Sequence, residues 1–253
     1  MKQKLWLVGK LILIAAGVFI VVYVFLNAPA LYQKAKYWYI TKFKHEAWPS
    51  AFQVMPVDLK NNLGYILSPT QSPTQIAANE EQKLKSELAL DNNYLYIPKL
   101  GIKAPINWNI SEAEALDKLQ TGVIHQVGTG LPGTDGNIFI AGHSSYYWWD
   151  PGGYKTIFAI LPNIGNDDII YVTYNNRLYT YHVAENLTVN PEDTWVMDKL
   201  DYPALTLMTC VPVGTNLQRF ILRAKQTSPN TNVVAPKTYT NPSAKPGLLP
   251  SIF

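Results

Sequence analysis

A single apolar run near the N-terminus places the tightest restriction on how this chain of 253 residues can fold. Leu11 to Leu26 is uninterrupted, and Leu5–Leu26 spans 22 residues when Lys10 extends its ammonium group toward the lipid headgroups. About 20 residues suffice for a helix to cross a bilayer, so the run predicts a membrane-spanning anchor. A cleaved signal peptide is the alternative, because Ala28-Pro29-Ala30 loosely fits a small-x-small cleavage site. The length of the run favours the uncleaved anchor.

The charge distribution separates this membrane segment from the rest of the chain. Residues 1–44 hold seven lysines and no acidic residue, and these lysines lie on both sides of the run. The charge rule alone therefore does not decide the orientation of the helix. Residues 91–226 hold nine Lys and Arg against 13 Asp and Glu, a balance of −4. The net charge of +3 thus comes from the membrane-proximal part, and no nucleic-acid footprint is visible.

Composition divides the chain into four predicted regions. Residues 1–44 contain the anchor and an aromatic and lysine-rich juxtamembrane helix that continues from it into the headgroup zone. Residues 45–92 are rich in proline and polar residues and predict a stalk, which the family resemblance described below places outside the cytoplasm. Residues 93–226 predict one folded domain. Residues 227–253 form a tail rich in Pro, Thr and Asn.

Residues 93–226 show the periodicity of a domain built mainly from strands. Ser111 with Glu114 forms a capping box, which predicts a short helix to about Leu119. Further short helices are predicted over Glu80–Leu88 and Thr156–Leu161. The predicted strands and extended segments are Tyr94–Ile97, Ala104–Ile106, Gly122–His125, Asn137–Ala141, Ile169–Tyr174, Leu178–Ala184, Leu205–Thr209 and Arg219–Lys225. The fifth and sixth of these flank Asn175-Asn176-Arg177 and predict a hairpin. About eight strands with few helices favour a β-barrel or a β-sandwich.

The only cysteine, Cys210, ends one of these predicted strands. A lone cysteine forms no internal disulfide, which leaves pairing with another chain, a buried inert thiol or a catalytic thiol. Strand alternation places Met208 and Cys210 on the same face. Folding the following hairpin brings Arg219 beside Cys210, with Arg223 a step further away. A thiol at a strand end with a guanidinium beside it is typical of a nucleophile with an oxyanion partner.

One of the four histidines occupies a position like that of the cysteine. His143 follows the end of a predicted strand, whereas His182 lies inside a hairpin strand and His45 lies near the stalk. When the strands before His143 and Cys210 are parallel neighbours, their C-terminal ends bring imidazole and thiol together. The joint pattern favours a catalytic pair over two structural side chains.

Four segments, taken in chain order, resemble the sortase family of cell-surface transpeptidases. They are Tyr96-Ile97-Pro98-Lys99-Leu100-Gly101-Ile102, Gly130–Gly133 with Gly136–Ser144, Gly165–Ile169, and Thr206–Cys210 with Arg219. The second resembles the LPG…GN…AGH segment of the family and the fourth its TLxTC…R signature. The third departs slightly, since Gly165-Asn166 stands where the family more often has Gly-Asp. The likeness covers about residues 93–226.

The resemblance implies a mainly β fold: a sortase-like closed eight-stranded β-barrel with short helices, plus the N-terminal transmembrane helix. It implies that Cys210 is the nucleophile, that His143 is the acid and base, and that Arg219 stabilises the substrate and the oxyanion. His125 stands where family members often have a histidine that is not the catalytic one. The implied substrate is an LPXTG-like surface-protein signal, cleaved after its threonine through a thioester. The implied acceptor is an amine on the cell envelope, from a peptidoglycan precursor or a protein lysine. The implied location is a single-pass anchor in the cell membrane with an extracytoplasmic catalytic domain.

Five further residues are predicted to contact substrate. Thr209 and Val211 flank the nucleophile, and Tyr146, Tyr147 and Trp148 directly follow the histidine segment. The aromatic residues are equally compatible with packing on the surface. No cluster of His, Cys and acidic residues has metal-ligand spacing, so neither a metal nor another cofactor is predicted, although some sortases use calcium.

Two alternative functions remain open from the residues themselves. The first is a thiol hydrolase or cysteine protease of the cell envelope that releases its product to water. Its papain-like form is disfavoured, because His143 precedes Cys210 here. The second is a surface-binding β-domain with an inert thiol. A pilus-type polymerase is less favoured, since neither an Asp-Pro-aromatic lid nor a second C-terminal membrane span is evident.

Overall fold

The computed structural model describes residues 2–43, 82–84, 86, 91–134, 136–229 and 249–250. Residues 82–84 and 86 are helical, which agrees with the predicted helix around them. Most of the predicted stalk, with His45, and most of the tail lie outside the described residues.

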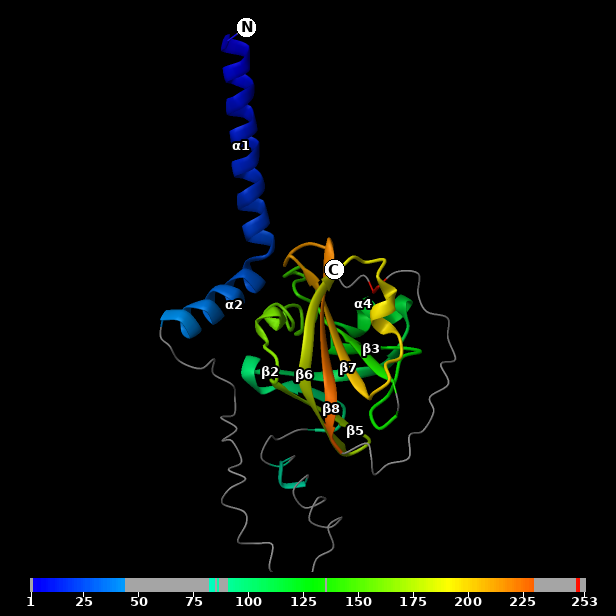
Figure 1. The fold of residues 1–253 in the computed structure, drawn as a ribbon. Helices are drawn as coiled ribbons and strands as arrows, with labels where there is room; N and C mark the ends of the chain where they lie inside the picture. Colours follow the sequence, from blue (N-terminus) through cyan, green and yellow to red (C-terminus); the bar gives the residue numbers. More distant parts are fainter. Residues whose placement is uncertain are drawn as a thin grey trace, which may run out of the picture.

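The N-terminal segment forms two helices that meet at an angle (Figure 1). α1 (Lys2–Leu26) includes a stretch from Trp6 to Leu26, 21 residues with a mean hydropathy of 2.6, that is long and apolar enough to cross a membrane. α2 (Ala28–Trp38) follows and continues as a π-helical turn, η1 (Tyr39–Phe43). The predicted juxtamembrane helix is therefore present, but a break separates it from α1 where an uninterrupted continuation was expected. Pro29 explains the break, because it lacks the N–H that would extend α1 and its ring would collide with a carbonyl of the preceding turn.

Eight strands close into a barrel (Figure 1), which confirms the predicted fold. The strands are β1 (Tyr94–Ile97), β2 (Ile102–Ile110), β3 (Val123–Gln126), β4 (Asn137–Ala141), β5 (Ile169–Tyr174), β6 (Arg177–Val189), β7 (Ala204–Val211) and β8 (Gln218–Ser228). Their order around the barrel is β1-β2-β3-β4-β7-β8-β6-β5. Two neighbouring pairs, β2 with β3 and β4 with β7, are parallel, and the others are antiparallel. The tight turn between β5 and β6 uses Asn175 and Asn176, both with positive φ, as the hairpin prediction requires.

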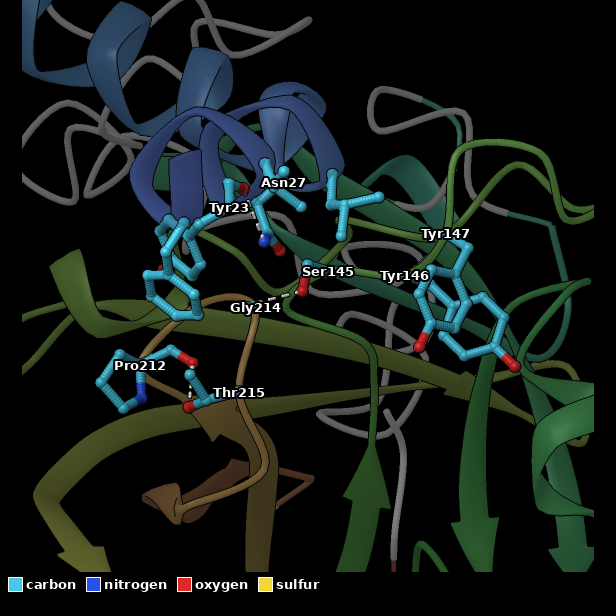
Figure 2. A pocket seen from close by; sticks show the side chains of 11 residues that line it. Tyr23, Asn27, Ser145, Tyr146, Tyr147, Pro212, Gly214 and Thr215 are labelled. Carbon is cyan, nitrogen blue, oxygen red and sulfur yellow. Dashed lines mark hydrogen bonds between the residues drawn. The ribbon is translucent and has the colours of Figure 1, made fainter. Parts of the chain in front are cut away.

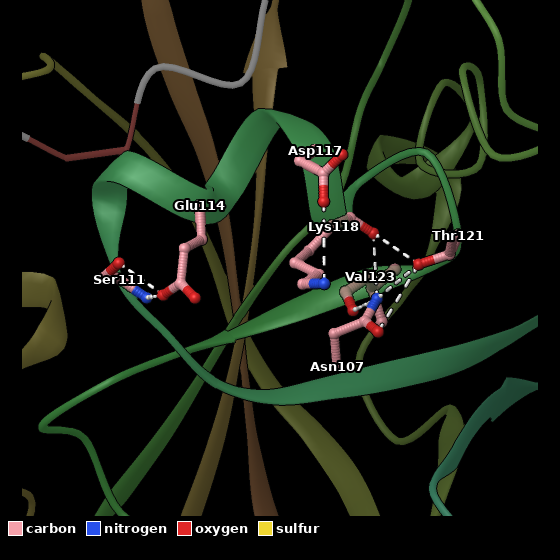
Figure 3. A network of polar contacts seen from close by, with 7 residues as sticks. All are labelled: Asn107, Ser111, Glu114, Asp117, Lys118, Thr121 and Val123. Carbon is pink, nitrogen blue, oxygen red and sulfur yellow. Dashed lines mark hydrogen bonds and ion pairs between the residues drawn. The ribbon is translucent and has the colours of Figure 1, made fainter.

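The parallel β2–β3 pair needs a crossover, and this connection contains the predicted capping box. Ser111 and Glu114 bond reciprocally at the start of η4 (Glu112–Glu114), which leads into α4 (Ala115–Lys118) (Figure 3). The Asn107 amide of β2 then donates to the Lys118 carbonyl at 2.9 Å (Figure 3). This network fixes the short helix over the outside of the barrel, next to the strands that carry the candidate site.

The connection between β4 and β5 differs from its prediction. Thr156–Leu161 forms successive tight turns rather than a helix, and only η5 (Leu161–Asn163) is a regular 3₁₀ turn. The Phe158 amide donates to the His143 carbonyl at 2.9 Å, outside any helix. Tertiary hydrogen bonding thus replaces the local pattern, and it fastens this connection to the end of β4.

The two faces of β7 pack against different clusters, as the strand alternation predicted. Leu205 and Leu207 point into the barrel core, where Leu222 of β8 meets them. Met208 and Cys210 belong to a second cluster on the outer face. Side chains of the α4 segment, of η6 (Thr194–Met197) and of the C-terminal tail cover this outer cluster, and they are Ala115, Leu119, Val196, Met197 and Leu249. Cys210 therefore lies outside the barrel interior but under a cover of helices.

Candidate active site

The pairing of β4 with β7 brings the ends of both strands together. Phe139 pairs with Thr206 and Ala141 with Met208 in parallel register. The ladder continues beyond the strand, since the Gly142 amide donates to the Met208 carbonyl at 3.1 Å. His143 is the next residue on one strand and Cys210 lies at the same end of the other. β4 and β7 therefore meet the condition stated from the sequence for bringing the ends that carry His143 and Cys210 together.

Arg219 lies directly opposite Cys210 in the antiparallel β7–β8 ladder. It is 1% exposed, and its Nη1 donates to the backbone carbonyls of Asn216 at 3.2 Å and Gln218 at 3.4 Å. Its Nε has no hydrogen-bond partner, and no ion pair of Arg219 occurs among the described residues. Burying a cation without a carboxylate is costly. The site therefore presents a positive charge that a negative or carbonyl oxygen would satisfy.

Arg223 differs from Arg219 in its charge balance. Its Nη1 forms an ion pair with Glu185 at 2.9 Å, and its guanidinium lies over the Trp195 ring, 5.2 Å from the centroid. It pairs with Thr206 in the ladder, away from the strand end. The neutralised charge and the position agree with the choice of Arg219 as the partner of the thiol.

The thiol itself contacts a residue that the sequence did not single out. Cys210 is buried and its Sγ donates to Asn216 Oδ1 at 3.5 Å. The backbone carbonyl of Asn216 also accepts from Arg219. From the loop between β7 and β8, Asn216 therefore contacts both the Cys210 thiol and the Arg219 guanidinium. An Asn in a loop gives no periodic signal, so only the fold reveals this contact.

His143 is buried at the end of β4 and stacks on an aromatic neighbour. Its ring centroid lies 4.6 Å from that of Tyr146 with 26° between the planes. Desolvation, then the nearby Asp150 and Tyr147, raises the pKa of Tyr146, so this phenol is neutral at physiological pH. Gly142 is required here, because a Cβ would lie 2.6 Å from the Phe158 ring. The close packing fixes the backbone from which His143 projects.

The five predicted substrate contacts occupy different environments. Tyr146 borders His143, while Tyr147 and Trp148 are exposed beyond it. Thr209 is buried and donates to the Gly142 carbonyl at 2.8 Å, and Val211 packs against the barrel core. The two flanking residues thus hold the strands together in this structure, and their contact with substrate stays a prediction.

His125, the other buried histidine, has a structural environment. The Asn109 amide donates to its Nδ1 at 3.2 Å, so Nε2 carries the hydrogen and donates to the Gly130 carbonyl at 2.8 Å. Burial lowers the pKa of His125 to about 4, partly offset by the bond to Gly130. The ring also packs at 5.1 Å from Trp108. His125 is therefore a neutral packing residue at physiological pH.

The C-terminal end of α1 lies against two loops of the site, the segment that follows β4 and the loop between β7 and β8. Tyr23 donates its hydroxyl hydrogen to the Val213 carbonyl at 2.6 Å, and the Gly214 amide donates to Ser145 Oγ at 3.0 Å. Gly214 has a φ of +80°, and a Cβ there would collide with the Asn27 amide. Between these parts lies a mainly apolar cavity of about 570 Å³ (Figure 2). No sequence pattern predicted this contact between α1 and the barrel.

No group of three or more His, Cys, Asp and Glu that could hold a metal ion occurs among the described residues. The chemical groups gathered at this end of the barrel are a thiol, an imidazole and a guanidinium. Such a set is suited to nucleophilic attack on a carbonyl with proton transfer and oxyanion stabilisation.

Comparisons with known proteins show which family the chain resembles. Sortase D of Bacillus subtilis (strain 168) is 26% identical over 163 residues, which cover 63% of this chain and 75% of that protein. Sortase SrtE1 of Streptomyces coelicolor is 29% identical over 143 residues, covering 52% and 39%. The crystal structure of sortase C1 from Streptococcus agalactiae has 30% identity, a TM-score of 0.47, and coverage of 60% and 78%. The sortase domain family matches residues 95–227, more than half of the chain. The protein therefore belongs to the sortase family, a family of membrane-associated cysteine transpeptidases.

Proposed function

We propose that this protein is a membrane-anchored transpeptidase that cleaves an LPXTG-like sorting signal and transfers the cleaved surface protein to an amine on the cell envelope. The observation that carries the proposal is the position of Arg219, a buried cation opposite Cys210 with an unsatisfied Nε. Among the described residues no carboxylate pairs with it. A substrate oxygen that gains negative charge is the partner that this guanidinium lacks.

In the first half of the reaction, Cys210 acts as the nucleophile. A thiol with the ordinary pKa of about 8.5 is only a few per cent ionised at neutral pH, so cationic neighbours raise its reactivity. The thiolate attacks the carbonyl carbon of the threonine, and Arg219 stabilises the oxyanion. The C–N bond then breaks as His143 gives a proton to the leaving amine, which leaves a thioester on Cys210.

In the second half, an acceptor amine replaces the departed peptide. Its nitrogen attacks the thioester carbonyl, His143 takes the proton from the amine, and the C–S bond breaks to return the thiolate. The product is a new amide bond. We assign the acceptor to a peptidoglycan precursor or a protein lysine, since both are present outside the membrane.

The anchoring part of the proposal depends on α1. The stretch from Trp6 to Leu26 has a suitable length and hydropathy, and none of its residues is fully buried, since only its last turns contact the barrel. A solvent-exposed apolar helix of this length is stable only when lipid surrounds it. We therefore assign α1 as a single-pass anchor in the cell membrane with the barrel on the extracytoplasmic side.

The test uses the full-length protein in detergent micelles with a labelled library of LPXTG-type peptides. We expect cleavage after threonine and capture of the acyl product by hydroxylamine or by an added amine. Retained cleavage in Cys210→Ala would contradict the assignment of the nucleophile. Arg219→Gln should remove most of the activity, whereas Arg223→Gln provides the matched control. Release of acid product alone, with no amine captured under any condition, would favour the thiol hydrolase.

A further inference from the structure

An exposed aromatic cluster lies at the active-site end of the barrel. Trp148 is 52% and Trp149 54% exposed, and Trp149 stacks on Tyr147 with ring centroids 4.8 Å apart. Leu217, in the loop between β7 and β8, is 68% exposed. Large apolar side chains gathered at one end of a domain indicate an interaction surface. The position of α1 next to this surface indicates what the surface binds.

The cluster lies at the level where the apolar helix ends. Phe25, in the last turn of α1, contacts Trp148 edge to face with ring centroids 6.3 Å apart. The hydrogen bond from Tyr23 to Val213 holds the β7–β8 loop against the same turn. Figure 1 shows this loop, in orange, beside the foot of α1. When α1 crosses a bilayer, both loops therefore lie at the boundary between hydrocarbon and water.

The cavity between α1 and these loops is apolar, like the exposed aromatic cluster. Its lining is mostly apolar, with Phe19, Val22 and Leu26 of α1 forming one wall. Two of the polar groups at its edge already bond to the β7–β8 loop. The Tyr23 hydroxyl donates to the Val213 carbonyl, and Ser145 Oγ accepts from the Gly214 amide (Figure 2). Hydrocarbon suits such a surface better than water does.

We propose that the active-site end of the barrel docks on the lipid headgroup–hydrocarbon boundary of the membrane that α1 crosses, through Trp148, Trp149 and Leu217. Tryptophan suits this layer, because its ring is apolar and its indole N–H bonds to polar headgroups. The inference rests on the anchoring role proposed for α1. It goes beyond anchoring, because a helix followed by a free domain would leave the barrel in water. Docking also restricts Cys210 to peptide bonds presented at the membrane surface.

Site-directed spin labelling tests the docking in the full-length protein reconstituted into phosphatidylcholine vesicles. Cys210→Ser supplies a cysteine-free background, since Cys210 is the only cysteine. Nitroxides are placed singly through Trp149→Cys and Leu217→Cys at the proposed surface. Ser228→Cys labels the end of β8 opposite the β7–β8 loop, and Ala16→Cys labels the middle of α1. The readout is collision with oxygen, enriched in lipid, relative to a polar nickel complex, enriched in water.

The proposal expects several-fold higher oxygen-to-nickel ratios at residues 149 and 217 than at residue 228. Ratios at both sites equal to that at residue 228, with residue 16 in lipid, would refute docking while leaving the anchor intact. An aqueous ratio at residue 16 would refute the anchor and the docking together. Two separate probes guard against local disruption by either label. The readout does not depend on catalysis, so the transpeptidase proposal fails or survives separately.

Discussion

Acidification removes stability that the buried His125 provides. The folded pKa of about 4 lies below the ordinary value of 6.5, so the unfolded chain binds the extra proton first. The stabilisation is therefore fully present above pH 6.5 and is lost as the pH falls toward 4. At about 1.4 kcal/mol per pH unit, the free energy of unfolding falls by roughly 2 kcal/mol by pH 5 and roughly 3 kcal/mol by pH 4. Protonation would also set a second N–H against the Asn109 amide, which now donates to Nδ1.

The assay is denaturant unfolding of the full-length protein in detergent at a series of pH values, followed by tryptophan fluorescence. Carboxylates titrate in the same range, so the comparison must be with a matched variant. His125→Gln keeps a donor for the Gly130 carbonyl and removes the titrating ring. Its unfolding free energy should fall by about 2 kcal/mol less than that of the parent between neutral pH and about pH 5. Parallel pH profiles for the two proteins would refute the reasoning.

Four substitutions, one of them a matched control, test the candidate site and the packing around it. Arg219→Gln should lower kcat/KM by on the order of 100-fold or more through loss of oxyanion stabilisation, whereas Arg223→Gln, whose charge is already paired, should stay within about tenfold in the same peptide assay. Gly142→Ala should destabilise the fold by about 1–3 kcal/mol, because the new methyl group overlaps the Phe158 ring; an unchanged denaturation midpoint would argue against this packing. Asn137→Ala should cost about 2–4 kcal/mol in the same unfolding measurement, since it orphans a buried threonine hydroxyl and a backbone carbonyl.

The strands were predictable because their signals are local. β4 and β5 begin and end at the predicted residues, and β7 and β8 extend their predictions by one to three residues. Alternation on β7 correctly separated Leu207 from Cys210. The segment from Thr156 to Leu161 failed because a long-range bond from Phe158 to His143 competes with helical bonding. The break before α2 was missed, although Pro29 offered the signal.

In the candidate site, too, local sequence patterns predicted some residues, whereas others depend on long-range contacts. The order of His143, Cys210 and Arg219 could be found from the sequence, since each lies next to an apolar run whose periodicity marks a strand end. Asn216 could not be found, because a loop residue acquires its partner only when the loop closes. The same holds for the contact between Tyr23 and the β7–β8 loop, which joins residues 190 positions apart.

By itself, the sequence determined the apolar helix, the strands and the candidate catalytic residues, because hydrophobic periodicity and residue type are properties of short segments. The tertiary structure alone decided that Arg219 is buried with no carboxylate partner in the described part of the chain and that Arg223 is neutralised by Glu185. It also decided that α1 ends against the loops of the site. These features depend on which distant segments lie side by side, and closure of the barrel and its long-range contacts set that arrangement.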